Sequence, residues 1–177
     1  VGEARFLRAL HYFNLGRAFG EVPLRTTPVD PGNREGLPLS PIKDIYDVII
    51  QDLEFAAEHC WGFGEIRNNY TNDIGRVTKA AAHAMLAKVY LRIASSKRTA
   101  LAGIEGNQPY LELPDDPGTY YQLAAEQADF ALAEDGYQLT TNLDDWINIF
   151  DAKNGNNPEM LFDIQGSTLT EQCTAGS

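Results

Sequence analysis

The sequence predicts an all-α protein in which two helical hairpins follow one another, each with a long loop at its turn. Apolar residues recur three and four positions apart over four long segments, which is the spacing of one helix face. Proline and glycine are concentrated between those segments. The first segment also resembles the third, and the second resembles the fourth.

The first hairpin is expected over residues 3–60. Its first helix, 3–19, ends at Gly20 and carries two apolar stripes: Phe6, Leu10 and Phe13, and Ala9, Tyr12, Gly16 and Phe19. Two stripes predict a helix sandwiched between others. A loop rich in proline and glycine follows at 25–39. Ser40, followed by a proline, is expected to cap the second helix, which ends near Cys60.

The second hairpin is expected over residues 78–135, after a loop at 61–75. Its first helix is predicted from Thr78 to Ser96 and is followed by an irregular insertion at 97–118. Thr119 and Gln122 have the spacing of a capping box, which predicts that the next helix begins there. A short helix at 143–150, with Trp146 in the core, and one strand at 160–165 complete the expected elements.

Composition excludes several classes of function. The formal net charge is −11, with 14 Lys and Arg against 25 Asp and Glu. Such a chain lacks the cations that bind nucleic acid without regard to sequence or hold a protein on anionic lipid headgroups. No run of about 18 apolar residues is present to span a bilayer. The chain begins inside a helical pattern and without methionine, so we expect a fragment of a longer protein.

The internal repeat resembles tetratricopeptide architecture. Ala4, Ala9 and Tyr12 of the first helix match Ala82, Ala87 and Tyr90 of the third. Small residues where helices approach closely, with an aromatic residue three positions on, are typical of tetratricopeptide repeats. The usual repeat has about 34 residues, and the two units of this chain are longer because of their loops. An ordinary helical bundle with chance similarity is the alternative.

Four segments, in order, resemble the SusD/RagB-like family. They are residues 2–24 (GEARFLRALHYFNLGRAFGEVPL), 40–54 (SPIKDIYDVIIQDLE), 75–91 (GRVTKAAAHAMLAKVYL) and 157–165 (NPEMLFDIQ). The resemblance covers nearly the whole chain, so residues 1–177 are expected to be the N-terminal helical domain of such a protein.

The resemblance implies a function. Family members are lipid-anchored on the extracellular face of the outer membrane, bind glycans or other nutrients, and deliver them to a TonB-dependent, SusC-like transporter. They are not enzymes and need no cofactor. The anchor is expected to lie outside this fragment. A tetratricopeptide scaffold that binds peptides in its groove is the alternative.

The loop at 61–75 is the expected glycan-binding site. Sugar rings stack on flat aromatic side chains, and amide or charged groups hydrogen-bond the hydroxyls; loops on a rigid scaffold carry such sites. The candidate residues are Trp61, Arg67, Asn68, Asn69 and Tyr70. A competing interpretation is that Trp61 and Phe63 fold back as a hydrophobic plug. The insertion at 97–118 is a second candidate surface, for a ligand or for a partner.

Catalytic and metal sites are not expected. The three histidines, His11, His59 and His83, lie on separate predicted helices without the spacing of a zinc site. Each adjacent carboxylate pair points its two side chains apart, so neither forms an acid–base couple. Cys60 and Cys173 match no metal or redox motif, and we expect them not to be paired.

Overall fold

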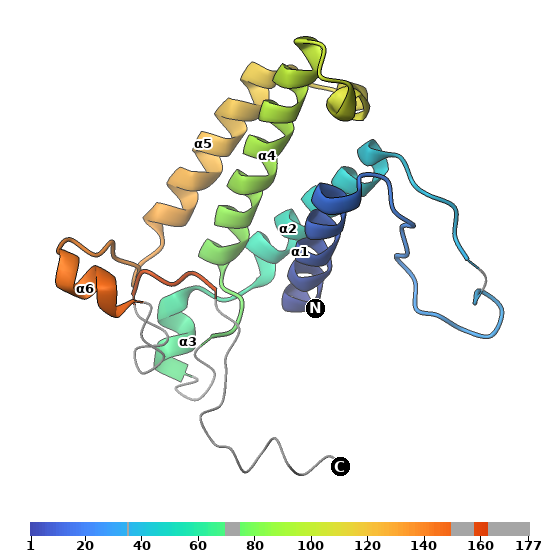
Figure 1. Ribbon diagram of the computed structural model, residues 1–177. Coiled ribbons are helices and arrows are strands. Elements are labelled where there is room, and N and C mark those ends of the chain that lie inside the picture. The colour runs from blue at the N-terminus through green and yellow to red at the C-terminus, as the bar shows by residue number, and fades with distance from the viewer. Residues whose placement is uncertain (35, 70–74, 150–157, 163–177) are drawn as a thin grey trace.

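The computed structural model describes residues 1–34, 36–69, 75–149 and 158–162, with backbone only at 67–69. These residues form helices and connecting segments (Figure 1). In chain order the helices are α1 (Gly2–Phe19), α2 (Ile42–His59), α3 (Phe63–Asn69), α4 (Lys79–Leu101), the 3₁₀ helix η1 (Glu105–Glu112), α5 (Pro117–Ala133) and α6 (Leu143–Asn148).

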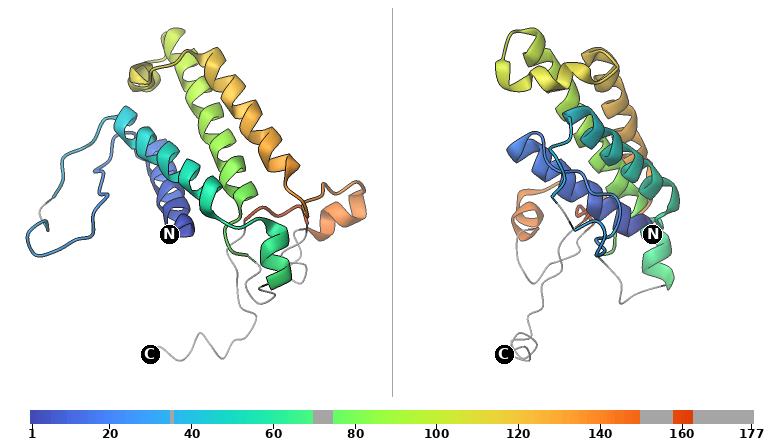
Figure 2. Two further views of the ribbon diagram at one scale, coloured as in Figure 1. Left: turned by 180° about the vertical axis from the view of Figure 1, so that it is seen from behind. Right: turned by 90° about the vertical axis from the view of Figure 1, so that its right-hand side faces the viewer.

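The long helices pack in the order in which they occur in the sequence. α1 packs on α2, α2 on α4, and α4 on α5, so two antiparallel hairpins lie side by side with α2 and α4 between them (Figures 1 and 2). Each hairpin therefore contacts only its neighbour, as in a helical-repeat protein. The predicted all-α, tetratricopeptide-like fold is confirmed.

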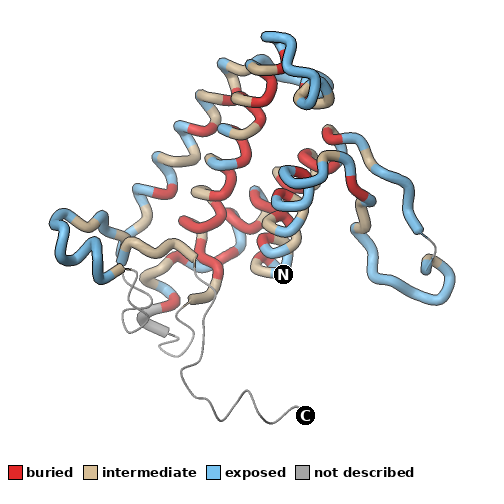
Figure 3. The backbone as a smooth tube through the Cα atoms, viewed as in Figure 1, coloured by how far each residue is buried: buried red, intermediate tan, exposed pale blue. Residues whose placement is uncertain are grey.

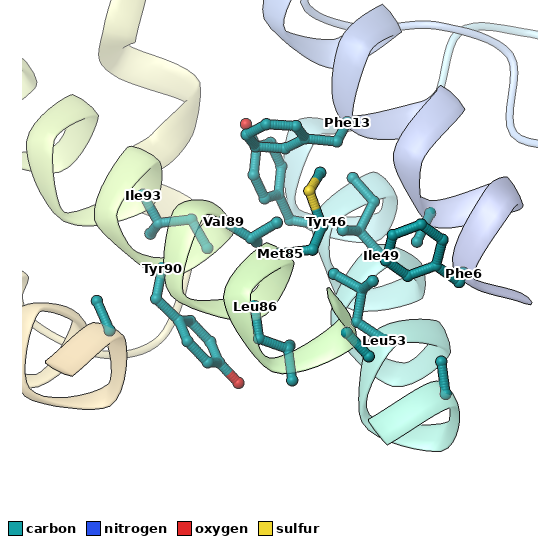
Figure 4. Close-up of a cluster of buried hydrophobic side chains, with 14 of the residues drawn as sticks. Phe6, Phe13, Tyr46, Ile49, Leu53, Met85, Leu86, Val89, Tyr90 and Ile93 are labelled. Carbon is teal, nitrogen blue, oxygen red and sulfur yellow. The ribbon is translucent and has the colours of Figure 1, made fainter. Parts of the chain in front are cut away.

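The hydrophobic core follows the inner faces of these helices, whereas α6 is exposed along its length (Figure 3). Side chains from α1, α2 and α4 converge in one cluster (Figure 4). Ten of its residues are Phe6, Phe13, Tyr46, Ile49, Leu53, Met85, Leu86, Val89, Tyr90 and Ile93. Ala9 and Ala82 are fully buried, which agrees with small residues at close helix approaches.

Tyr46 lies where α1, α2, α4 and η1 meet. Its side chain is fully buried, and its ring makes edge contacts with Phe13, at 6.3 Å between centroids, and with Tyr110, at 5.4 Å. The Tyr46 and Tyr110 hydroxyl oxygens lie 3.0 Å apart, so one donates to the other. Burial raises the pKa of Tyr46 above its usual value, so this hydroxyl stays neutral.

A buried carboxylate joins the two helices of the first hairpin. Asp52 of α2 is 2% exposed, and Arg8 of α1 donates to both of its oxygens, at 2.6 Å from Nε and 2.7 Å from Nη2. Arg5 adds a weaker ion pair at 3.9 Å and lies over the ring of Phe55, 4.0 Å from its centroid. The bidentate pair satisfies a charge that would otherwise be costly to bury.

Several predicted helix boundaries are wrong. Ser40 does not cap α2. Pro41 is the N-cap residue, with no side-chain capping hydrogen bond, and the Ser40 amide donates to Val22 O. The capping box at Thr119 and Gln122 is absent. Asp116 caps α5 instead, because its carboxylate accepts from the amides of Gly118 and Thr119, at 2.7 and 3.2 Å.

The insertion expected at 97–118 is more regular than predicted. α4 continues to Leu101, and η1 follows. The expected loop at 61–75 also contains a helix, α3. The helix starts predicted at 78 and 143 are confirmed. Thr78 and Asn142 cap these helices, since their side chains accept from Ala81 N and Asp145 N.

The short helix expected at 143–150 is present as α6, but two other C-terminal expectations are wrong. The described part of the expected strand, Met160–Phe162, is not a strand. Phe162 instead packs edge-on against Phe6 of α1, with ring centroids 5.2 Å apart. Trp146 is not in the core but 49% exposed, because the six-residue α6 buries none of its residues. Phe19, placed on the second stripe of α1, is 75% exposed.

The Arg8–Asp52 pair should contribute strongly to stability. We expect Asp52→Asn to lower the free energy of unfolding by about 2 kcal/mol, because a bidentate charge-assisted pair is lost in a buried position. Asp47→Asn is the control on the same helix, because the ion pair of Asp47 with Lys43 is half-exposed. We expect this control to lower the free energy of unfolding by less than about 0.5 kcal/mol. Urea denaturation measures both, and equal effects would contradict this role of Asp52.

Candidate functional site

The expected binding segment is held in place by a short helix. The Gly62 amide donates to Glu65 Oε2 at 2.7 Å, and Ile66 is 3% exposed, so the first turn of α3 is anchored at both of these positions. Arg67, Asn68 and Asn69 occupy the last three backbone positions of α3. Tyr70 lies outside the described residues.

Trp61 lies at the junction between the two hairpins. Its carbonyl oxygen accepts from Lys79 N, the first residue of α4, at 3.0 Å. The guanidinium carbon of Arg76 lies 5.2 Å from the centroid of the Trp61 ring, and Arg76 Nε donates to Glu3 of α1 at 3.0 Å. The Trp61 side chain nevertheless remains 38% exposed. The partly exposed indole is therefore held between the hairpins by the Trp61 backbone hydrogen bond and by Arg76.

Phe63 packs against another side chain, as expected for the hydrophobic plug. The Phe63 ring packs on Tyr137, with centroids 4.7 Å apart, and Tyr137 and Thr78 share a hydrogen bond of 2.7 Å between their hydroxyl oxygens. Burial raises the pKa of the Tyr137 hydroxyl, which stays neutral. These contacts join the start of α3 to the segment that follows α5.

The neighbours of Trp61 and Phe63 were not found from the sequence. Glu3, Arg76 and Tyr137 come from three separate segments, and nothing in their local sequence marks them as neighbours of Trp61 or Phe63. A glycine with φ +99° precedes Tyr137, which marks a turn but does not show where the tyrosine packs. The proximity of these residues depends on how the hairpins stack.

The described residues do not assemble a metal site. Across 1–34, 36–69, 75–149 and 158–162, no group of three or more His, Cys, Asp or Glu side chains could hold a metal ion. His59 Nδ1 lies 2.9 Å from Phe55 O, and His83 Nδ1 lies 2.7 Å from Gln127 Oε1 between α4 and α5. Cys60 is a buried free thiol whose pKa burial raises, so it stays protonated. Cys173 lies outside the described residues.

Comparison with known proteins agrees with the observed helical fold. Residues 1–91 match a SusD-like family model described as "Starch-binding associating with outer membrane". A SusD-like protein of Bacteroides ovatus is 32% identical over 178 residues, which is 97% of this chain and 27% of that relative. The chain belongs to the SusD-like family.

Two solved structures resemble the fold. One, described as a complex with xylogluco-oligosaccharide, is 29% identical, has a TM-score of 0.70 and matches 94% of this chain and 29% of its own. The other, a laminarin-binding SusD-like protein, is 25% identical, has a TM-score of 0.63 and matches 91% of this chain and 29% of its own. The chain thus spans less than a third of the length of each of these relatives. No helix in the part of the chain that the structure describes is both long and apolar enough to cross a membrane.

The packing of Phe63 can be tested through the glycine that it covers. Gly136 has φ +99°, and an added Cβ would lie 2.4 Å from Phe63 Cδ1. We expect Gly136→Ala to cost at least about 2 kcal/mol, from backbone strain together with displacement of the Phe63 ring. Gly103→Ala is the control, because Gly103 has φ +90° and open space around it; backbone strain alone should cost about 1 kcal/mol. Equal losses in urea denaturation would contradict a packed Phe63.

Proposed function

We propose that the protein to which this chain belongs captures an extracellular polysaccharide or oligosaccharide and delivers it to a TonB-dependent, SusC-like transporter of the outer membrane. It acts by non-covalent binding and not by catalysis. A lipid anchor outside residues 1–177 holds it on the extracellular face of that membrane. The helical hairpins are the scaffold, and the segment at 61–70 contributes to the glycan site.

The observation that carries this proposal is the partly exposed ring of Trp61, whose backbone and side chain are both held by contacts within a SusD-like fold. Trp61 keeps 38% of its surface exposed, while its backbone is tied to α4 and its ring is covered on one side by Arg76. Such a ring can stack on the apolar face of a sugar without a large loss of conformational entropy on binding. Xylogluco-oligosaccharide and laminarin, named for two similar structures, are both glucan-derived ligands and support this class.

Polar groups around Trp61 suit a saccharide. Arg76 is paired with Glu3, so this part of the site presents both donors and acceptors with nearly balanced charge. Sugar hydroxyls donate and accept hydrogen bonds, and they need such mixed partners. Arg67, Asn68, Asn69 and Tyr70 supply further amide, guanidinium and hydroxyl groups in the same segment.

Calorimetric titration of the full-length protein with xyloglucan oligosaccharides, laminarin and starch tests the proposal. We expect one of these glycans to bind, and Trp61→Ala to weaken its binding about tenfold, which is about 1.4 kcal/mol. Tyr70→Ala should weaken binding as well. Trp146→Ala is the matched control, because Trp146 is exposed on α6 and should not contribute.

The possible outcomes separate the parts of the proposal. Loss of binding in the Trp61 and Tyr70 variants, with Trp146→Ala unchanged, would support a glycan site at 61–70. Unchanged binding in all three would place the site elsewhere in the protein. The absence of binding to every glycan tested would contradict glucan capture.

A further inference from the structure

The guanidinium of Arg92 lies where α4 meets α2 and η1, beside the buried tyrosine pair. Its carbon is 5.6 Å from the centroid of the Tyr110 ring, and the hydroxyls of Tyr46 and Tyr110 are the neighbouring polar groups that act on it. The side chain of Arg92 is partly buried. An arginine side chain stays charged in a protein, so its positive charge must be balanced by its surroundings.

No carboxylate balances this charge within the part of the chain that the structure describes. None of the ion pairs found there includes Arg92, although acidic residues outnumber Lys and Arg by 25 to 14 in the whole chain. Removing a charge from water is costly unless the charge is paired. We therefore expect Arg92 to have an anionic partner that these residues do not supply.

Two buried polar atoms on the same face of α4 lack hydrogen-bond partners among the described residues. One is Arg92 Nε and the other is the hydroxyl oxygen of Ser96, and both are closed off from solvent. Ser96 is 2% exposed and lies one helical turn beyond Arg92, so the two side chains are neighbours on α4. Buried polar atoms are nearly always paired, so these two atoms indicate a bound group that accepts from both.

The tyrosine pair adds a further donor. The hydroxyl oxygens of Tyr46 and Tyr110 lie 3.0 Å apart and share one hydrogen bond, which is the only one that either hydroxyl makes to the described residues. Two hydroxyls carry two protons, and one bond uses one of them. Arg92 Nε, Ser96 and one tyrosine therefore each hold a proton without an acceptor.

We propose that Arg92 and Ser96 bind a compact monovalent anion, a halide such as chloride or a carboxylate group, at the junction of α2, α4 and η1. An anion accepts from these donors and also balances the guanidinium charge. A water molecule brings two protons of its own and no charge, so it suits the site less well. Because Arg92 Nε and the Ser96 hydroxyl are closed to solvent, a sugar ring or a lipid headgroup is too large to reach both.

The anion would act as a structural ligand. Tyr46 belongs to α2, Arg92 and Ser96 to α4, and Tyr110 to η1, so one ion on these groups ties three elements together. A ligand that binds only the folded state stabilises that state in proportion to the logarithm of its concentration, once the site is nearly full. This site does not depend on glycan capture or on delivery to a transporter.

Thermal unfolding of the full-length protein tests the site. At constant ionic strength, sodium isethionate, whose anion is bulky, is replaced stepwise by sodium chloride. We expect the melting temperature to rise and then level off. Arg92→Met should raise the half-maximal chloride concentration at least about tenfold, and Ser96→Ala about threefold, because each removes one donor and the first also removes the charge.

Matched variants and a heavier halide make the test specific. Arg98→Met removes an exposed arginine of the same helix, and Ser95→Ala removes the hydroxyl of a half-buried neighbour. We expect both controls to keep the wild-type response to chloride. In crystals of the full-length protein soaked in sodium bromide, the anomalous signal should place bromide within hydrogen-bonding distance of Arg92 Nε.

The outcomes distinguish a free ion from a carboxylate of the protein itself. A chloride response that Arg92→Met weakens, with bromide at Nε, supports a free ion. A melting temperature that ignores chloride, with a carboxylate of the longer protein seated on Arg92, supports the same site with an internal occupant. Water alone at Arg92 Nε overturns the anion site. A chloride response that Arg92→Met and Ser96→Ala leave unchanged also overturns it, because chloride then binds elsewhere.

Discussion

The packing of Tyr46 is the constraint on which the arrangement of the helices depends. This side chain is fully buried where α1, α2, α4 and η1 meet, and it carries a hydroxyl that cannot be left unpaired at that depth. Tyr110 supplies the partner. Gly16 of α1 packs close to the same side chain, since a Cβ there would lie in ordinary contact with Tyr46 and Ile45, at 3.9 and 3.8 Å. One side chain thereby links both hairpins to the connection between α4 and α5.

Contacts of α2 and α4 hold both ends of this helix pair, η1 at one end and Trp61 with α3 at the other. At one end, the Tyr46–Tyr110 pair fixes the position of η1. At the other end, Trp61 and α3 follow directly from α2, and the hydrogen bond from Lys79 N to Trp61 O ties them to the start of α4. The segment 61–66 and η1 therefore lie at opposite ends of the same pair of helices, α2 and α4 (Figure 1).

Three polar contacts join separate helices and segments of the scaffold. Asp52 with Arg8 links the first hairpin, Glu3 with Arg76 links α1 to the segment before α4, and Lys97 links α4 to η1. Apolar burial supplies most of the driving force for folding, but it does not select one helix register over another. Because a buried charge tolerates few alternatives, the contacts of Asp52 and Lys97 favour the observed register.

The sequence by itself determined the helical segments, the pairing of the hairpins and the family. These features follow from local spacing, since apolar residues three and four positions apart define helix faces and small residues mark close approaches. Contacts between distant segments were decided only by the tertiary structure. Asp116 and not Thr119 caps α5, Trp146 is exposed although it lies in an apolar run, and Arg76 lies over Trp61. Periodicity assigns a residue to a face of its own helix, but the stacking of the helices decides what that face meets.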